Sequence, residues 1–228
     1  MNSMINKMHV EIWSDVMCPF CYIGKRKFEI ALSQFPEKEN IHIVWRSFQL
    51  SPDMKTDPTK NINQFLAEHK GINLEEAKQM NDYVTNMASE VGLIYHFENA
   101  IVANSFNAHR FTHFAKAYGK QNEAEEKLFH AYFTDGKNTD DIQTLMQLCK
   151  EIELDAETLE KELESGMYVD EVRTDLAEAN QLGIRGVPFF LFNRKLAISG
   201  AQDPDIFLKA MTKAFNEWRV LNPEEELL

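Results

Sequence analysis

Segments with the pattern of β-strands lie only near the two ends of this chain of 228 residues. Residues 9–13 alternate polar and apolar side chains, a second extended run covers 41–48, and two more cover 186–192 and 196–200. From residue 61 to about residue 182 the apolar residues recur at helical spacing. A sheet in this chain must therefore be assembled from segments that are far apart in the sequence.

The order of these segments is strand–helix–strand, then a helical block, then strand–strand–helix. The first unit predicts two parallel strands joined by a right-handed crossover. A thioredoxin-like α/β fold has this arrangement when a large all-helical insertion separates its βαβ and ββα halves. We expect residues 8–58 and 183–220 to form the thioredoxin-like domain and residues 59–182 to form the helical insertion domain.

Polar residues indicate where several of the helices begin. Asn73 with Glu76, and Asn122 with Glu125, have the three-residue spacing of a capping box. Asp203 stands directly before a proline, which suits the first position of the last helix. We expect these asparagine and aspartate side chains to cap their helices.

Two cysteines separated by two residues, Cys18 and Cys21, lie where the first strand gives way to the first helix. Unpaired backbone N–H groups and the helix dipole stabilise an anion at such a junction. Pro19 suits the first helical turn because its missing N–H is not needed there. A Cys-x-x-Cys motif at a helix N-terminus can lower a thiol pKa from about 8.5 to about 3.5–7.5. The motif and its position together predict a redox site.

A zinc site is the competing interpretation of the same pair. A structural zinc ion needs four ligands, commonly from two such cysteine or histidine pairs. The third cysteine, Cys149, stands alone in the sequence, and no histidine pair lies close to it or to the motif. We therefore predict no metal site. Cys149 is interpreted as a small apolar residue on a helix face, and a role as a third redox thiol stays open.

The charge balance is 24 basic against 36 acidic residues, a net charge of −12. Nucleic acids and anionic membranes bind surfaces on which lysine and arginine cluster, so we predict no nucleic-acid or membrane partner. Residues 1–8 contain no sustained apolar segment of the kind that a secretory signal requires. We therefore expect a cytoplasmic protein, where a Cys-x-x-Cys pair is catalytic or redox-sensing rather than structural.

Four short motifs are similar to the DsbA-like thioredoxin superfamily and, within it, to the FrnE-like group of dithiol–disulfide oxidoreductases. They occur in the order of the family and together span nearly the whole chain. The motifs are SDVMCPFCYIG at 14–24, NSFNAHR at 104–110, GIRGVPFF at 183–190 and SGAQ at 199–202.

The resemblance implies roles for residues at the matching positions. Cys18 would be the exposed nucleophilic thiol, and Cys21 the resolving thiol beneath it. Pro188 would adopt a cis peptide bond opposite the redox pair, which is compatible with the near restriction of cis bonds to proline. The backbone of Val187 would pair with an extended substrate segment, as in β-augmentation.

Other candidate substrate contacts are less constrained by the pattern. Pro19 and Phe20, between the two cysteines, are expected to touch substrate. Asn104 lies in the second motif, and Ser105 and His109 share a helix face four residues apart, so this face could line a groove beside the cysteines. Equally, His109 could be a structural polar residue that packs the insertion against the thioredoxin core.

Phe20 departs from the periplasmic DsbA pattern, which carries histidine in this dipeptide. Phenylalanine cannot donate a hydrogen bond to a thiolate. We therefore expect a less depressed Cys18 pKa and a less oxidising couple. The additional C-terminal cysteine pair of some FrnE-like proteins is absent, which argues against isomerase activity of the multi-disulfide kind.

The implied function is that of a protein dithiol–disulfide oxidoreductase acting on protein or small-molecule thiols and disulfides. No cofactor beyond the redox-active disulfide is implied, with glutathione a candidate co-substrate and the glutathione or thioredoxin system a candidate electron partner. Similar folds serve 2-hydroxychromene-2-carboxylate isomerases and kappa-class glutathione transferases, which typically place serine at the nucleophile position. A redox-sensitive binding or chaperone-like protein is a third alternative.

Overall fold

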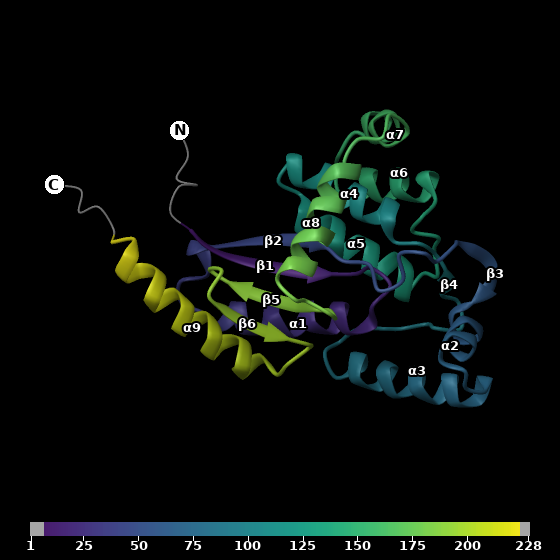
Figure 1. Cartoon of the computed structure of the whole chain (residues 1–228), viewed down its shortest axis with the longest axis horizontal. Coiled ribbons are helices and arrows are strands. Elements are labelled where there is room, and N and C mark those ends of the chain that lie inside the picture. Colours follow the sequence, from purple (N-terminus) through teal and green to yellow (C-terminus); the bar gives the residue numbers. More distant parts are fainter. Residues whose placement is uncertain (1–6, 224–228) are drawn as a thin grey trace.

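The computed structural model describes residues 7–223 and contains a four-stranded sheet built from both ends of the chain. The strand order is β2-β1-β5-β6, formed by β1 (Met8–Ser14), β2 (Ile41–Ser47), β5 (Phe189–Phe192) and β6 (Leu196–Ser199). β1 runs parallel to β2 and antiparallel to β5, and β6 is antiparallel to β5. The first strand, β1, is thus central: it pairs on one side with β2, the second strand of the βαβ unit, and on the other with β5 of the C-terminal hairpin (Figure 1).

Helices α1 (Pro19–Gln34) and α9 (Pro204–Leu221) cover one face of this sheet. Apolar side chains from both helices and all four strands form a continuous core there, with Phe28 of α1 and Phe207 of α9 packed against Phe190 of β5. The ring centroids of Phe190 and Phe207 are 4.6 Å apart. This burial of aromatic surface holds the two halves of the chain together.

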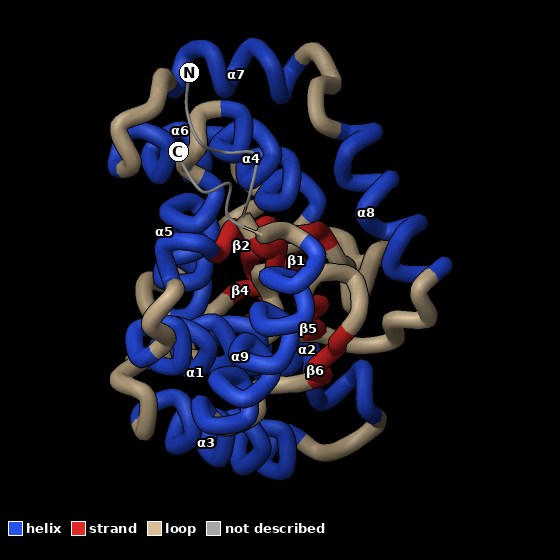
Figure 2. The backbone as a smooth tube through the Cα atoms, turned by 90° about the vertical axis from the view of Figure 1, so that its left-hand side faces the viewer, coloured by secondary structure: helices blue, strands red, loops and turns tan. Residues whose placement is uncertain are grey.

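The insertion supplies most of the remaining helices (Figure 1). Helix α8 packs on the face of the sheet opposite α9, where Trp13, Ala179, Ile184 and Leu191 form a separate buried cluster. Figure 2 shows α7 and α3 at opposite ends of the molecule. The insertion helices are α2 (Ile62–Lys70), α3 (Leu74–Ser89), α4 (Phe106–Ala117), α5 (Gln121–Phe133), α6 (Ile142–Glu151), α7 (Ala156–Glu164) and α8 (Val169–Gln181).

The predicted α/β fold with a large helical insertion is confirmed, with one addition. A two-stranded antiparallel ribbon, β3 (Asp57–Asn61) with β4 (Ile101–Val102), lies at the start of the insertion and brackets α2 and α3. The β3 segment, DPTKN, has neither alternation nor β-branched apolar residues, so its pattern did not indicate a strand. The ribbon is held by tertiary contacts rather than by local propensity.

Two of the three predicted helix caps differ in the structure. Asn73 and Glu76 form the expected capping box of α3. Helix α5 instead begins at Gln121, and the side chain of Asn122 accepts a hydrogen bond from the indole N–H of Trp45. Asp203 occupies the N-cap position of α9 without a side-chain cap, and its carboxylate pairs with Lys27 at 3.2 Å. Tertiary partners have displaced the local bonds in both cases.

Helix α1 is joined to α5 by a cluster of charged side chains. Lys25 is almost fully buried, and its ammonium group lies 2.6 Å from carboxylates of both Glu29 and Glu126. Arg26 and Tyr22 also bond to Glu126. A buried ammonium group needs such partners, because an unpaired one would carry a large desolvation penalty. The cluster fixes the insertion against the helix that carries the cysteines.

Candidate active site

The cysteine motif lies at the junction between β1 and α1. Cys18 is the N-cap of α1, with extended backbone angles (φ −88°, ψ 111°), and Pro19 occupies the first turn. The Cys18 N–H donates to the carbonyl of Asp15 at 2.9 Å, which closes the turn that leads out of the strand. The predicted placement at a strand-to-helix junction is therefore confirmed.

Both thiols are reduced and both are largely buried. Cys18 is 3% exposed and Cys21 is 1% exposed, so the expectation of an exposed Cys18 is not met. The Cys18 thiol donates to the backbone carbonyl of Val187 at 3.6 Å. Burial raises the pKa of the Cys21 thiol well above its ordinary value, and the neighbouring Cys18 thiol raises it further, opposed by Asp15 and Ser14.

The loop before β5 packs tightly against α1. The Val187–Pro188 peptide bond is cis, and the Pro188 carbonyl accepts from the N–H of Gly200 at 2.8 Å. A Cβ atom added to Gly24 would lie 2.8 Å from Cγ of Pro188, closer than carbon atoms pack. Gly24 thus allows the proline loop to reach α1 and places the Val187 carbonyl over Cys18.

An apolar groove of about 930 Å³ opens beside Cys18. One wall is the start of α1, including Pro19 and Phe20, and the other is the hairpin of α2 and α3. Phe20 is 38% exposed within it. The groove is lined by Met17, Cys18, Pro19, Phe20, Leu50, Ser51, Ile62, Phe65, Leu66, His69, Lys70, Glu76, Gln79, Met80, Asn81, Tyr83, Val84 and Phe97.

Residues 9–212 match the model of the DSBA-like thioredoxin domain. The chain belongs to the DSBA-like thioredoxin family. A structure of a probable DsbA oxidoreductase from Streptomyces coelicolor is 37% identical and has a TM-score of 0.86, covering 92% of this chain and 91% of its own. An uncharacterized Bacillus subtilis (strain 168) protein, YwbO, is 29% identical over 90% of this chain and 96% of its own.

More distant structures share the fold of this DsbA-like chain. The cytosolic disulfide reductase DsbM from Pseudomonas aeruginosa is 14% identical with a TM-score of 0.61, covering 93% of this chain and 96% of its own. DsbM has also been solved with GSH. A 2-hydroxychromene-2-carboxylate isomerase is 15% identical with a TM-score of 0.65, covering 94% of this chain and all of its own.

Asn104 and His109 lie outside the groove of the DsbA-like site, although they were candidate substrate contacts. The amide N–H₂ of Asn104 donates to the carbonyls of Pro52 and Met54, at 3.2 and 2.7 Å. His109 is 1% exposed, and its Nε2 lies 2.8 Å from the carbonyl of Phe48. Asn104 thus fixes the segment after β2, and His109 joins α4 to Phe48, the residue that follows β2.

Two residues near the cysteines were not identified from the sequence. Asp15 is fully buried, and its carboxylate accepts from the backbone N–H groups of Met17 and Leu50, at 3.3 and 2.7 Å. The Tyr95 hydroxyl donates to the carbonyl of Pro19 at 2.8 Å. Asp15 belongs to the first family motif, so the sequence could have indicated that it lies near the cysteines. Tyr95 is 76 residues from Pro19 in the sequence and belongs to no motif, so the sequence did not indicate its position.

Over residues 7–223 no cluster of three or more histidine, cysteine, aspartate or glutamate side chains could hold a metal ion. Cys149 is buried in α6, away from the groove, and burial raises the pKa of its thiol to about 11.

Within residues 7–223 no helix is long and apolar enough to cross a membrane. The expectation that residues 1–8 hold no secretory signal falls mostly on residues 1–6, which lie outside the described residues.

Proposed function

We propose that this protein is a thiol–disulfide oxidoreductase in which Cys18 attacks a substrate disulfide and Cys21 resolves the mixed disulfide. The Cys18 thiolate bonds to one substrate sulfur, and the other substrate sulfur leaves and takes up a proton. Cys21 then loses its proton and bonds to the Cys18 sulfur, which releases the second substrate thiol. The substrate disulfide is reduced while the cysteine pair is oxidised, and the reverse sequence oxidises a dithiol.

The observation that carries this proposal is the different setting of the two thiols. Cys18 caps α1 and lines the groove, where a substrate sulfur can approach a thiolate stabilised by the helix N-terminus. Cys21 does not line the groove, and its thiol has a raised pKa because it is buried. A group in the first setting suits attack on substrate, and one in the second suits an internal reaction with its neighbour.

The groove supports a substrate that presents apolar side chains or an apolar small-molecule skeleton next to its sulfur. Phe20, Phe65, Met80 and Tyr83 supply aromatic and thioether surface that adapts to ligands of different shape. The Val187 carbonyl contacts the Cys18 thiol, so the Val187 backbone lies where it can pair with an extended segment. Both kinds of substrate, protein and small molecule, are consistent with this arrangement.

We further propose membership of the FrnE-like group, a cytoplasmic location, and exchange with the glutathione or thioredoxin pool. The four sequence motifs support the first point. At the level of the fold, DsbM supports the other two, because it is a cytosolic disulfide reductase and has been solved with GSH.

A glutathione-dependent isomerase or transferase remains the second candidate because the fold is shared with a 2-hydroxychromene-2-carboxylate isomerase. The cysteine pair argues against it. That chemistry requires one group to activate glutathione, and a resolving thiol next to that group would divert it into a disulfide. Both Cys18 and Cys21 are present here.

The deciding experiment follows turnover of a fluorescent peptide disulfide with glutathione as reductant, and in parallel the conjugation of glutathione to an electrophile. We expect disulfide reduction by the wild-type protein and by Cys149→Ser, loss of reduction in Cys18→Ser, and no conjugation. Conjugation that survives in Cys21→Ser would support the second candidate instead. Stable complexes with unfolded protein and no turnover would support a binding protein.

A further inference from the structure

A large apolar side chain, Leu50, is exposed in the groove beside the cysteines. It is 47% exposed and lines the groove together with Cys18 and Phe20. It lies in the irregular segment 48–56, which connects β2 to β3. A single exposed leucine is ordinary on a protein surface. The way in which the backbone around Leu50 is held indicates that this one has a function.

The first half of this segment is fastened to the turn that leads into the cysteine motif. The N–H of Leu50 donates to Oδ2 of Asp15 at 2.7 Å. The other oxygen of the same carboxylate accepts from the N–H of Met17 at 3.3 Å. Hydrogen bonds to a charged acceptor are stronger than those between neutral groups, and Asp15 is fully buried. One carboxylate therefore sets the position of Leu50 relative to the residue before Cys18.

The second half of the segment is fastened by Asn104 of the insertion. Its amide N–H₂ group donates to the carbonyls of Pro52 and Met54, at 3.2 and 2.7 Å. Both lie in a β-turn that is closed by a bond of 3.1 Å from the Met54 N–H to the Ser51 carbonyl, with Pro52 at its second position. The amide oxygen of Asn104 accepts from the side chain of Gln49 at 3.0 Å. The single side chain of Asn104 thus holds the segment at two places.

Asn104 is itself anchored in the insertion. Its amide oxygen also accepts from the N–H of Phe106, the first residue of α4, at 2.8 Å. Its backbone N–H donates to Oγ1 of Thr56 at 2.9 Å, and Thr56 bonds in turn to the carboxylate of Asp140. Asp140 also accepts from the side chain of Asn107 on α4, at 2.8 Å. Every polar group of the Asn104 side chain has a partner, so its orientation is fixed.

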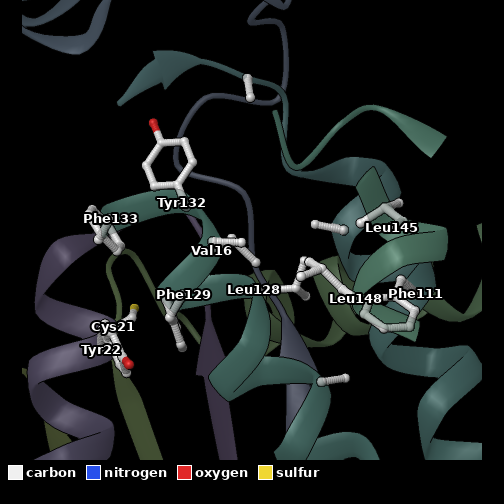
Figure 3. Close-up of a cluster of buried hydrophobic side chains, with 14 of the residues drawn as sticks. Val16, Cys21, Tyr22, Phe111, Leu128, Phe129, Tyr132, Phe133, Leu145 and Leu148 are labelled. Atoms are coloured by element: carbon white, nitrogen blue, oxygen red, sulfur yellow. The ribbon is translucent and has the colours of Figure 1, made fainter. Parts of the chain in front are cut away.

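The opposite side of the cysteines is closed by the core of the insertion. Figure 3 shows Cys21 in a buried cluster with Phe129 and Phe133 of α5. Cys18 belongs to the same cluster but also lines the groove. A substrate sulfur therefore reaches Cys18 from the groove, and the residues next to that sulfur enter the groove that Leu50 lines.

We propose that Leu50 is a specificity-determining residue that contacts apolar side chains flanking the substrate cysteine, and that Asn104 positions it. This inference rests on the proposed function and deepens it, because it selects peptide disulfides with apolar residues next to the reacting cysteine. A contact surface that is already fixed loses little conformational freedom when substrate binds. Asn104 thereby has an indirect part in substrate selection, although it does not line the groove.

Turnover of two fluorescent peptide disulfides, with glutathione as reductant, tests the proposal. One peptide has leucine on both sides of its cysteine, and the other has glycine. The wild type should have a kcat/KM about 10-fold higher for the leucine peptide, which is the size of discrimination that apolar contacts give. Leu50→Ala should reduce this ratio to less than about 3-fold, chiefly by raising KM for the leucine peptide. A wild type without this preference, or a Leu50→Ala variant that keeps it, would overturn the proposal.

The Asn104→Asp variant tests the positioning role. Aspartate keeps the acceptor oxygen but has no donors for the carbonyls of Pro52 and Met54. The ratio between the two peptides should fall as it does in Leu50→Ala, and the double variant should lower it no further, because both changes remove the same contact. A merely structural role would slow the turnover of both peptides alike. An unchanged ratio, or losses that add in the double variant, would therefore overturn the role of Asn104.

Leu182→Ala is the matched control, because Leu182 is also 47% exposed but lies at the end of α8 and does not line the groove. Its ratio should equal that of the wild type. Leu50→Glu keeps the proposal testable if the Asn104 variants do not fold. It should favour a peptide with lysine on both sides of its cysteine over the leucine peptide, and failure to do so would overturn the contact. The absence of any turnover that depends on Cys18 would instead refute the proposed function.

Discussion

At the scale of single residues, the dipeptide between the cysteines is where sequence reasoning was most specific. Phe20 is 38% exposed at the groove, consistent with a side chain that meets substrate. The exposure of Cys18 was not predictable, because the cover comes from the Val187 loop, 169 residues away in the sequence. The motif identified the chemistry of the thiol, and tertiary packing decided its accessibility.

Replacing Phe20 by histidine should make the couple more oxidising. An imidazole can donate a hydrogen bond to the Cys18 thiolate or stabilise it by charge, which favours the reduced protein. Each 1.4 kcal/mol of such stabilisation raises the potential by about 30 mV for this two-electron couple. Equilibration with glutathione buffers measures the change, and Phe20→Leu controls for loss of the ring. An unchanged or more negative potential would show that the surroundings, not the dipeptide, set the couple.

The order of the two thiols in the reaction is also testable at this scale. Cys21→Ser should accumulate a mixed disulfide with a peptide substrate, because the attacking sulfur is linked and nothing resolves it. Cys18→Ser should accumulate none. Mass spectrometry of the protein quenched with acid distinguishes the two. Accumulation in Cys18→Ser and not in Cys21→Ser would reverse the assignment.

At the scale of elements, hydrophobic periodicity was a good guide to where helices and strands lie, and a poorer one to their ends. The helix predicted from Asn73 has its capping box, whereas Asn122 bonds to Trp45 of β2 instead of capping α5. The β3–β4 ribbon has no local signal at all. What sequence reasoning missed is in each case set by a partner distant in the sequence.

Gly24 is expected to tolerate no side chain, although it lies inside a helix where alanine is normally favoured. The Cβ of alanine would meet Pro188 at 2.8 Å and push the proline loop away from α1. Gly24→Ala should therefore lower the free energy of unfolding by about 1–3 kcal/mol, as overpacking does, and slow disulfide exchange. Urea denaturation measures the first effect. Gly119→Ala is not a suitable control, because the backbone of Gly119 is left-handed and alanine would be strained there.

A better control for that prediction is Ala31→Gly in the same helix. Ala31 is fully buried, so its loss should destabilise α1 by helix propensity and a small cavity while leaving the Pro188 contact in place. The two variants should differ in exchange rate even where their stabilities are matched by temperature. Equal rates at matched stability would mean that the contact between Gly24 and Pro188 has no functional role.

At the scale of the whole molecule, the insertion and the thioredoxin-like part share buried charge. Lys25 of α1 is paired with Glu126 of α5, and Asp15 lies beside His109 of α4. These contacts join segments about 100 residues apart, which explains why sequence patterns could separate a helical block but could not indicate which of its residues contact α1 and the turn before it. The proposed division at residues 59–182 describes topology, since the core is continuous across it.

This shared charge predicts that stability falls as pH rises through neutrality. The pKa of Glu125 is raised from 4.5 to about 7 in the folded protein, chiefly by burial. Its contribution is therefore fully present below about pH 4.5 and is lost as pH rises through about 7. The raised pKa of His109 acts in the same direction. The loss from Glu125 should be on the order of 3 kcal/mol in unfolding free energy.

Urea denaturation of the reduced protein at a series of pH values measures this loss, with Glu125→Gln as the comparison. Glutamine cannot ionise, so the variant should lose less unfolding free energy than the wild type between about pH 4.5 and pH 8. At pH 8 the variant should therefore keep a larger fraction of its own low-pH stability than the wild type keeps of its own. Glu123→Gln should follow the wild type, because Glu123 is exposed. If the wild type and Glu125→Gln have parallel profiles, Glu125 does not titrate in this range. The fall in stability with rising pH would then come from other groups, His109 among them, whose pKa is also raised in the folded protein.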